Sequence, residues 1–501
     1  MSFQFISTRN MNRSVSAPEA VFQGLAPDGG LFVPTQFPQL GFDLDQLPSK
    51  SYRELATHLL KQGLPGYTAE TMDAVVRLGY AEGKFDDPLF APVKSFGDRH
   101  FIELFHGPTL AFKDMALSLL PHLLVAAQKQ LGISKEAVIL TATSGDTGSA
   151  ALTGFADLPN TRIVVFYPDQ GISLVQKKQM VCQPGKNLFV CGVDGNFDQA
   201  QSLVKALFAN KVLPTTLDQN NQSFSTANSM NIGRLIPQMV YYFHAYGQLI
   251  EKGKVSSGDP INIVVPSGNF GNILAAWYAK QAGLPVKTFL VASNKNHALP
   301  DFFNTGIYSA DRPFHRTDSP SMDILISSNL ERLLFHLSGN DAPLISTLMT
   351  ELKQKKRYAV PDTLKARIQS EFYAGYCDDA ACRDEIKRYH KKTNYVLDPH
   401  TAVASRVLSN YQQSTTDTTP ALIAATASPF KFPATVFPAL FGSPPQGTDF
   451  DLIRIIAQKT AVEVPSILQN LENAKPLHTD HCTPDTAFNY VQNTLSKGIL
   501  S

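Results

Sequence analysis

"INIVVPSGNFGNILAAWYAKQAG", residues 261–283, joins a strand-like run to a helix-like run through a glycine-rich loop. The first part is apolar and rich in β-branched residues, which favours a strand buried on both faces. The last part carries apolar residues at helical spacing. A buried strand that leads through a short loop into a helix is typical of parallel sheets, whose ligands bind beyond the carboxyl ends of the strands.

The same pattern recurs along the chain. Further β-branched runs, each followed by a loop and a helical pattern, are "RHFIELF" (99–105), "EAVILTA" (136–142), "RIVVFYP" (162–168), "VKTFLVA" (286–292) and "ALIAATA" (421–427). Strands that alternate with helices predict an α/β fold with mostly parallel sheet covered on both faces. Residues 1 to about 90 contain amphipathic helical patterns instead, which predict a helical N-terminal unit.

Composition limits the class of protein. The 501 residues suit two to four domains, and 44 basic against 43 acidic side chains give a net charge of +1. This balance argues against a nucleic-acid or anionic-membrane partner. The sequence has no apolar run long enough to span a membrane and no secretory signal at its start. Its five cysteines are scattered and include no CxxC pair, so we expect a cytoplasmic protein without a disulfide framework.

One short stretch, "HTDHC", brings together His478, His481 and Cys482. Neighbouring ligands on one loop rarely complete a zinc site, and no second ligand pair is evident in the sequence. We interpret the stretch as a surface loop and expect no metal.

Three polar loops are candidates for binding anions, because glycine permits close backbone approach and helix starts offer free N–H groups. They are Thr143, Ser144, Gly145, Asp146 and Thr147 after the run 136–142, Ser267, Gly268, Asn269, Phe270, Gly271 and Asn272 after the run 261–266, and Asn228, Ser229, Asn231 and Arg234 ahead of an apolar helical pattern. Neither glycine loop fits the P-loop or dinucleotide motifs. Each loop alone is explained as an ordinary turn or helix cap, but the set suits a phosphorylated cofactor with an anionic substrate.

A lysine lies where helices usually avoid one. Within "FHGPTLAFKDMALSLL" (105–120), Lys113 falls in the expected first turn of a helix, with Thr109 as the candidate N-cap. Helix N-termini carry partial positive charge and disfavour an ammonium group. The side chain is therefore either solvated and bent away, or an amine kept neutral and reactive. On this stretch alone, the solvated side chain is the favoured explanation.

Seven motifs in order along the chain closely resemble the threonine synthase family of pyridoxal-phosphate (PLP) enzymes. They are "ISTRN" (6–10), "LAPDGGLFVP" (25–34), "FHGPTLAFKDMA" (105–116), "TATSGDTGSAA" (141–151), "NSMNIGRLIPQ" (228–238), "PSGNFGN" (266–272) and "TASPFKFP" (426–433). The resemblance implies PLP fold type II, with two open, mostly parallel, twisted sheets flanked by helices and a helical N-terminal domain. It implies an N-terminal domain at 1–90, a larger PLP-binding domain from 91–130 and 256–501, and a smaller domain at 131–255 that carries substrate-binding loops.

The resemblance also implies roles for the candidate residues. Lys113 would hold PLP covalently and act as the catalytic base. Gly268, Asn269, Phe270, Gly271 and Asn272 would cradle the PLP phosphate, and Thr426 would bond the pyridine nitrogen. Thr143, Ser144, Gly145, Asp146 and Thr147 would bind the substrate carboxylate, and Asn228, Ser229 and Arg234 the substrate phosphate. Related folds have Asn where this loop has Asp146, and some members have His where this chain has Ser428, so neither residue receives a defined role.

The implied reaction converts O-phospho-L-homoserine and water to L-threonine and phosphate, by loss of phosphate from Cγ and addition of water at Cβ. A phospholyase of the same fold, which would release a 2-oxo acid, differs little in its motifs. A serine or threonine dehydratase would have no use for a phosphate receptor. A non-catalytic PLP-binding protein, and an ATP- or NAD-dependent protein, complete the alternatives. The sequence leaves the choice between monomer and homodimer open.

Overall fold

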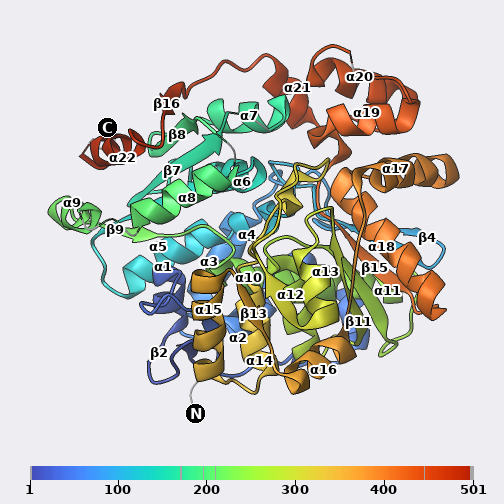
Figure 1. Ribbon diagram of the computed structural model, residues 1–501, viewed down its shortest axis with the longest axis horizontal. Helices are drawn as coiled ribbons and strands as arrows, with labels where there is room; N and C mark the ends of the chain where they lie inside the picture. The colour runs from blue at the N-terminus through green and yellow to red at the C-terminus, as the bar shows by residue number, and fades with distance from the viewer. Residues whose placement is uncertain are drawn as a thin grey trace.

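The computed structural model describes residues 3–169, 172–195, 197–208, 210, 212–444 and 446–496 (Figure 1). Its larger sheet has the strand order β14-β11-β10-β15-β5-β4, and only the edge pair of β4 and β5 is antiparallel. The strands are β4 (Val93–Phe96), β5 (Arg99–Glu103), β10 (Ile261–Pro266), β11 (Val286–Ser293), β14 (Phe372–Tyr376) and β15 (Ala421–Ala425). The predicted mostly parallel sheet is confirmed.

A smaller sheet has the order β16-β8-β7-β6-β9, and all its neighbours are parallel. Its strands are β6 (Glu136–Ala142), β7 (Thr161–Pro168), β8 (Leu188–Val193), β9 (Gln222–Ser225) and β16 (Asp480–Cys482). The runs predicted at 136–142 and 162–168 match β6 and β7 closely, because the apolar residues of buried parallel strands are continuous in sequence.

Helices cover both faces of each sheet. Along β10, Ile263 and Val265 pack with one apolar cluster and Val264 with another, as the alternation of side chains requires. On the smaller sheet α6 and α7 contact one face, whereas α8, α9 and α22 share a cluster with the other. Helices of the smaller sheet are α6 (Asp146–Phe155), α7 (Leu174–Val181), α8 (Phe197–Phe208), α9 (Leu213–Gln219) and α22 (Ala487–Ser496). Helices that contact strands of the larger sheet include α11 (Met239–Glu251), α12 (Gly271–Gln281), α13 (Ala298–Thr305), α16 (Asp362–Glu371) and α18 (Pro399–Thr415). Other helices of the described residues are α4 (Asp114–Leu117), α5 (Leu120–Gln130), α10 (Ile232–Leu235), α14 (Leu330–Leu337), α15 (Ala342–Lys355), α17 (Asp379–Thr393), α19 (Pro433–Phe441), α20 (Asp449–Thr460) and α21 (Ser466–Glu472).

The N-terminal region is helical as predicted, but it also contains a small antiparallel sheet. Its helices are α1 (Ala17–Gln23), α2 (Tyr52–Gly63) and α3 (Ala69–Gly79), and its strands, in the order β2-β1-β3, are Ser14–Val15, Phe5–Ser7 and Phe32–Pro34. Strands of two or three residues are too short to show period-two alternation, so the sequence does not reveal them. A further two-stranded sheet pairs β12 (Ile307–Ser309) with β13 (Arg357–Ala359).

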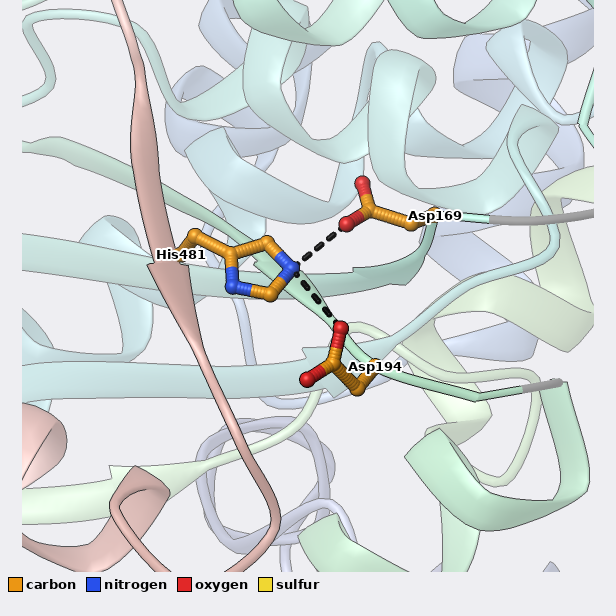
Figure 2. Close-up of side chains that lie close together, drawn as sticks. All are labelled: Asp169, Asp194 and His481. Atoms are coloured by element: carbon orange, nitrogen blue, oxygen red, sulfur yellow. Dashed lines mark hydrogen bonds and ion pairs between the residues drawn. The ribbon is translucent and has the colours of Figure 1, made fainter.

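The C-terminal segment runs from α19–α21 along the top of Figure 1 to the smaller sheet, where β16 pairs with β8. The stretch interpreted as a surface loop, 478–482, therefore contains an edge strand. His481 anchors this strand, because its Nε2 lies 2.5 Å from Asp169 Oδ2 and 3.4 Å from Asp194 Oδ1 (Figure 2). The predicted domain ranges stay a prediction, although the pairing places 480–482 beside strands of the range 131–255. Of the helices in the described residues, none is long and apolar enough to cross a membrane.

Candidate functional site

The site lies where the carboxyl ends of strands from both sheets meet. Lys113 begins α4 after β5, and the loop 267–270 follows β10. The backbone N–H of Phe112 donates to Thr426 O at 2.8 Å, so the residue that directly follows β15 lies beside the lysine. Asp146, at the start of α6 after β6, reaches the same point from the smaller sheet. The structure thus brings the predicted Lys113, Asp146 and Thr426 together.

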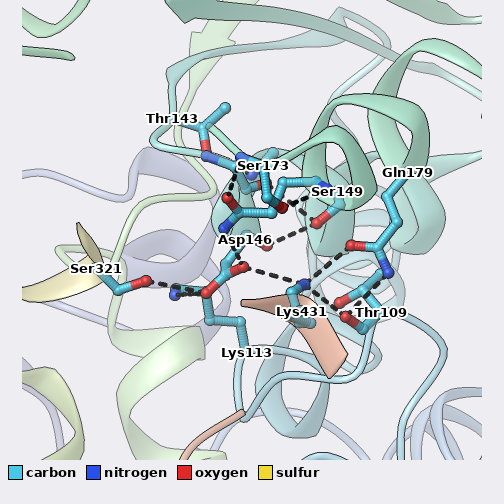
Figure 3. Close-up of polar contacts among 12 residues, drawn as sticks. Thr109, Lys113, Thr143, Asp146, Ser149, Ser173, Gln179, Ser321 and Lys431 are labelled. Carbon is cyan, nitrogen blue, oxygen red and sulfur yellow. Dashed lines mark hydrogen bonds and ion pairs between the residues drawn. The ribbon is translucent and has the colours of Figure 1, made fainter. Parts of the chain in front are cut away.

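Lys113 is buried and its Nζ donates to Asp146 Oδ2 at 3.1 Å (Figure 3). Burial lowers the pKa of Lys113 from its ordinary value, the nearby Asp146 opposes that change, and the positive charges of Lys431 and Arg234 add to it. The solvated side chain, which the stretch 105–120 alone favoured, is therefore wrong, because Lys113 is buried against Asp146. Lys113 is the N-cap residue of α4, so it lies at a helix N-terminus as predicted, although just before the first turn and not within it.

Asp146 is held by four side chains. Lys431 Nζ lies 3.0 Å from Oδ1 and Gln176 Nε2 donates to the same oxygen at 2.8 Å, while Ser321 Oγ donates to Oδ2 at 3.0 Å. Burial alone would raise the pKa of Asp146, but Lys113, Lys431 and the Gln176 hydrogen bond together hold it well below its usual range. Asp146 is therefore a carboxylate that accepts hydrogen bonds.

The glycine loop after β10 leaves no space for a side chain at Gly268 and holds Phe270 in the left-handed region. Phe270 adopts φ 63°, and a Cβ on Gly268 would lie 2.9 Å from the Ser321 carbonyl oxygen. The loop ends at the N-terminus of α12, where backbone N–H groups have no helical acceptor. Asn272 Oδ1 accepts from Tyr242 Oη, which leaves its buried Nδ2 without a partner among the described residues. Free donors at a helix N-terminus fit a phosphate group.

Arg234 is a buried cation with unused hydrogen-bonding capacity. It is 4% exposed, and its Nη1 donates to Ala227 O at 2.8 Å. Its Nε has no hydrogen-bond partner within the part of the chain that the structure describes. Burial lowers the pKa of Arg234 to about 10. A buried guanidinium whose partner is a neutral carbonyl calls for an anion.

The segment that contains Asn228 and Ser229 meets the glycine loop. Asn329 Nδ2 donates to Ser229 Oγ at 3.0 Å and to Asn269 O at 2.9 Å, so one amide joins the two predicted phosphate loops. Arg332 Nη2 donates to Met230 O at 2.6 Å, next to that junction. Asn228 contacts the smaller sheet instead, because its Oδ1 accepts a hydrogen bond from Thr141 Oγ1 of β6.

The loop after β6 is shaped by its own residues. Thr143 Oγ1 accepts from the backbone N–H groups of Gly145 and Gly148, each at 2.9 Å, so this hydroxyl caps α6. Gly145 has φ 124°, a conformation that other residues rarely adopt. Ser144 and Thr147 are partly exposed on the same loop. A role for this loop in carboxylate binding stays a prediction.

Sequence reasoning missed several residues of the site. Lys431, Gln176 and Ser321 contact Asp146 from segments far away in the chain, and no local spacing identifies them. The only available signal was the position of Lys431 within "TASPFKFP". The candidate N-cap Thr109 was wrong, because its hydroxyl and N–H both donate to the Asp114 carboxylate and the helix begins five residues later.

Comparison with known proteins identifies this arrangement. Residues 4–80 match the family model "Threonine synthase N terminus", and residues 101–424 match "Pyridoxal-phosphate dependent enzyme". The chain is 39% identical to human "Threonine synthase-like 1" over 87% of its length, but spans 60% of that protein. It is 36% identical to threonine synthase of Pseudomonas aeruginosa over 88% of this chain and 91% of that protein. The PLP-bound threonine synthase of Brucella melitensis has a TM-score of 0.85 at 34% identity, covering 99% of this chain and 100% of that one.

The fold and these matches define a PLP-dependent enzyme of fold type II, which confirms the predicted fold class and cofactor. More particularly, the chain belongs to the threonine synthase family.

Proposed function

We propose that this protein is a threonine synthase, which converts O-phospho-L-homoserine and water to L-threonine and phosphate. The observation that carries the proposal is Arg234, a buried guanidinium whose Nε has no partner among the described residues and whose charge meets no carboxylate there. A substrate phosphate would satisfy both its charge and its free N–H. A dehydratase acting on serine or threonine would leave this cation without a partner.

The residues present fit PLP. Asn272 Nδ2 and the first N–H groups of α12 would hold its phosphate, Lys113 its aldehyde carbon and Thr426 its ring nitrogen. The cofactor, when bound, withdraws electrons from the substrate carbons next to the amine. Neutral Lys113 would accept a proton from those carbons, and the Asp146 carboxylate, 3.1 Å away, would stabilise the ammonium that forms. Arg234 would bind the phosphate as it leaves Cγ, before water adds at Cβ.

A second candidate is a phospholyase that releases a 2-oxo acid in place of threonine. Similarity does not separate the two reactions, because the relatives named "Threonine synthase-like 1" are as similar to this chain as the named threonine synthases. The reaction would use the same receptor for phosphate and the same base. The two candidates differ in whether water adds to the substrate before release.

One incubation separates the candidates. Purified, PLP-loaded protein is mixed with O-phospho-L-homoserine, and phosphate, threonine and 2-oxobutyrate are quantified together. Equal amounts of phosphate and threonine establish the synthase, and phosphate with 2-oxobutyrate establishes the lyase. Absence of all three products would contradict both reactions and leave a non-catalytic PLP protein. L-Homoserine, which has the same carbon chain but lacks the phosphate, serves as the control and should give no product.

We also propose a cytoplasmic location. It is supported by five cysteines that are all free thiols, which are typical of reducing compartments. Fractionation of cells that express the protein at its native level tests this location.

A further inference from the structure

Lys431 is the most completely buried cation near Asp146. It is 0% exposed, and its Nζ contacts three oxygens: Thr109 O at 2.6 Å, Gln179 Oε1 at 2.9 Å and Asp146 Oδ1 at 3.0 Å. An ammonium group has three N–H donors, so each has an acceptor. A neutral amine could donate only two hydrogen bonds. The geometry around Lys431 is therefore that of an ammonium ion.

Lys113 has different surroundings, although it contacts the same carboxylate (Figure 3). Among the described residues the polar partner of Lys113 Nζ is Asp146 Oδ2 alone, and this nitrogen otherwise lies 5.0 Å from the centre of the Phe112 ring. One acceptor is enough for a neutral amine, and too few to compensate the burial of a cation. The two lysines therefore differ in how well the site supports their charge.

We propose that Lys431, rather than Lys113, is the permanent counter-ion of Asp146, and that this pairing leaves the nitrogen of Lys113 free to lose its proton. Lys431 is then a positioning residue, because it acts on the reacting nitrogen through Asp146. This also explains why the loop can have a carboxylate, which cannot donate, beside a reactive lysine. The inference rests on the proposed role of Lys113 in the reaction.

The charges that face Lys113 are consistent with this assignment. Asp146 is negative, while Lys431 and Arg234 are positive and disfavour a third positive charge on Lys113. His400 lies near Asp146, and Asp114 lies near Lys431. Burial raises the pKa of Asp114, so its carboxyl is a poor alternative partner for Lys431. Removal of Lys431 would leave Asp146 to pair with Lys113.

The test follows the protonation of Lys113 in the PLP-loaded protein through the visible absorbance of the cofactor between pH 5 and pH 10. In Lys431→Met, Asp146 keeps its charge and loses its counter-ion, so it stabilises the protonated nitrogen of Lys113. The midpoint of the absorbance change with pH should therefore rise by about one pH unit or more. In the double variant Asp146→Asn, Lys431→Met both charges are absent, and the midpoint should return to within about half a pH unit of wild type. Lys431→Arg keeps the charge and should titrate close to wild type.

Lys178→Met is the matched control, because Lys178 Nζ also has three acceptors, the carbonyl oxygens of Leu471, Glu472 and Ala474, but no carboxylate. Its midpoint should not move. If Lys431→Met does not fold, as judged by circular dichroism, Lys431→Gln replaces it and should give the same rise.

The inference would be overturned if folded Lys431→Met or Lys431→Gln had a titration midpoint equal to or lower than that of wild type. It would also be overturned if the midpoint of the double variant stayed as high as that of Lys431→Met. Borohydride trapping with mass spectrometry locates the PLP attachment in wild type. Attachment to another lysine would show that the proposed role of Lys113 has failed, which is distinct from attachment at Lys113 with no shift.

Discussion

At the scale of single residues, Arg234 places a buried positive charge in the site and thereby lowers the stability of the folded protein. An unpaired buried cation destabilises the fold until an anion binds, and truncating it removes that penalty. For Arg234→Met we therefore expect turnover of O-phospho-L-homoserine to fall about 10- to 100-fold in kcat/KM, as the loss of hydrogen bonds to a charged group predicts. The melting temperature without ligand should stay equal or rise.

The control for Arg234 is Arg162→Met. Arg162 is as deeply buried, but its Nε lies 3.1 Å from the Glu136 carboxylate and outside the site. Breaking that pair should lower the melting temperature and leave kcat/KM of the folded fraction unchanged. Steady-state kinetics and thermal melts of both variants check the contrast, and a large loss of stability in Arg234→Met would contradict it.

His106 gives the protein a pH-dependent stability. Burial alone would lower its pKa, but hydrogen bonds to Asp86 Oδ1 at 2.6 Å and Glu103 Oε2 at 3.0 Å raise the pKa of His106 to about 9. Because the folded value is raised above 6.5, the contribution is complete below pH 6.5 and is lost as the pH rises through 9.

We therefore expect His106→Asn to lower the free energy of unfolding by about 1–2 kcal/mol at pH 6, after allowance for solvent screening at Asp86. The difference from wild type should shrink above pH 9. Urea titrations at pH 6 and pH 10 check this prediction. A difference that is the same at both values would show that the two carboxylates do not hold the charged form.

Part of the site could be read from the sequence because it lies on loops directly after strands. Lys113 and Asn272 belong to such segments. Polar residues directly after an apolar strand run indicate a binding site, because parallel sheets bind ligands at the carboxyl ends of their strands. Lys431 and Ser321 could not be found in this way. Their role depends on which atoms of distant segments meet Asp146, and a single sequence contains no record of that proximity.

At the scale of elements, the start of α14 connects parts that the chain keeps far apart. Its N-cap residue, Asn329, contacts Ser229 and Asn269, and Arg332 one turn later donates through Nε to Phe32 O of β3 at 2.9 Å. The two phosphate loops and the N-terminal sheet are thus fastened to one helix end. Both loops should loosen when this junction is broken.

For Asn329→Ala we expect the dissociation constant of PLP to rise about 5- to 50-fold, since two hydrogen bonds that position phosphate donors are lost. KM for O-phospho-L-homoserine should rise as well. Asn262→Ala is the control, because Asn262 is equally buried but lies at the opposite end of β10, bonded to Asp417 at 3.0 Å. Fluorescence titration with PLP compares them, and equal affinities would remove Asn329 from the site.

The elements themselves were predicted unevenly. Strands such as β6 and β11 are continuous apolar runs and were found within a residue or two. β16 was missed, because its three residues are mostly polar and gain their pairing from β8 and the contacts of His481 (Figure 2). The order of strands in each sheet could not be predicted either, because pairing between distant segments produces no periodic pattern in a single sequence.

At the scale of the whole molecule, the two sheets face one site that has excess buried positive charge. Arg332 is 0% exposed, and its partners are the neutral oxygens of Phe32, Ser229, Met230 and Asn329. Burial lowers the pKa of Arg332 to about 10, in parallel with Arg234. Lys431 pairs with the Asp146 carboxylate, so Asp146 does not neutralise either arginine. The unliganded protein is therefore strained electrostatically, and anions should stabilise it.

This argument predicts that an anion without the rest of the ligand stabilises the whole protein. Inorganic phosphate at about 100 times its dissociation constant should add about 2.7 kcal/mol to the free energy of unfolding, because it binds only the folded state. Sodium chloride at equal ionic strength should add much less, since screening alone cannot supply acceptors for buried N–H groups. Thermal melts of the PLP-loaded protein measure both effects, and loading keeps phosphate from the cofactor's own loop. Arg234→Met should lose most of the phosphate effect. If phosphate and chloride act equally, the buried arginines are compensated within the protein, and the receptor for a substrate phosphate must lie elsewhere.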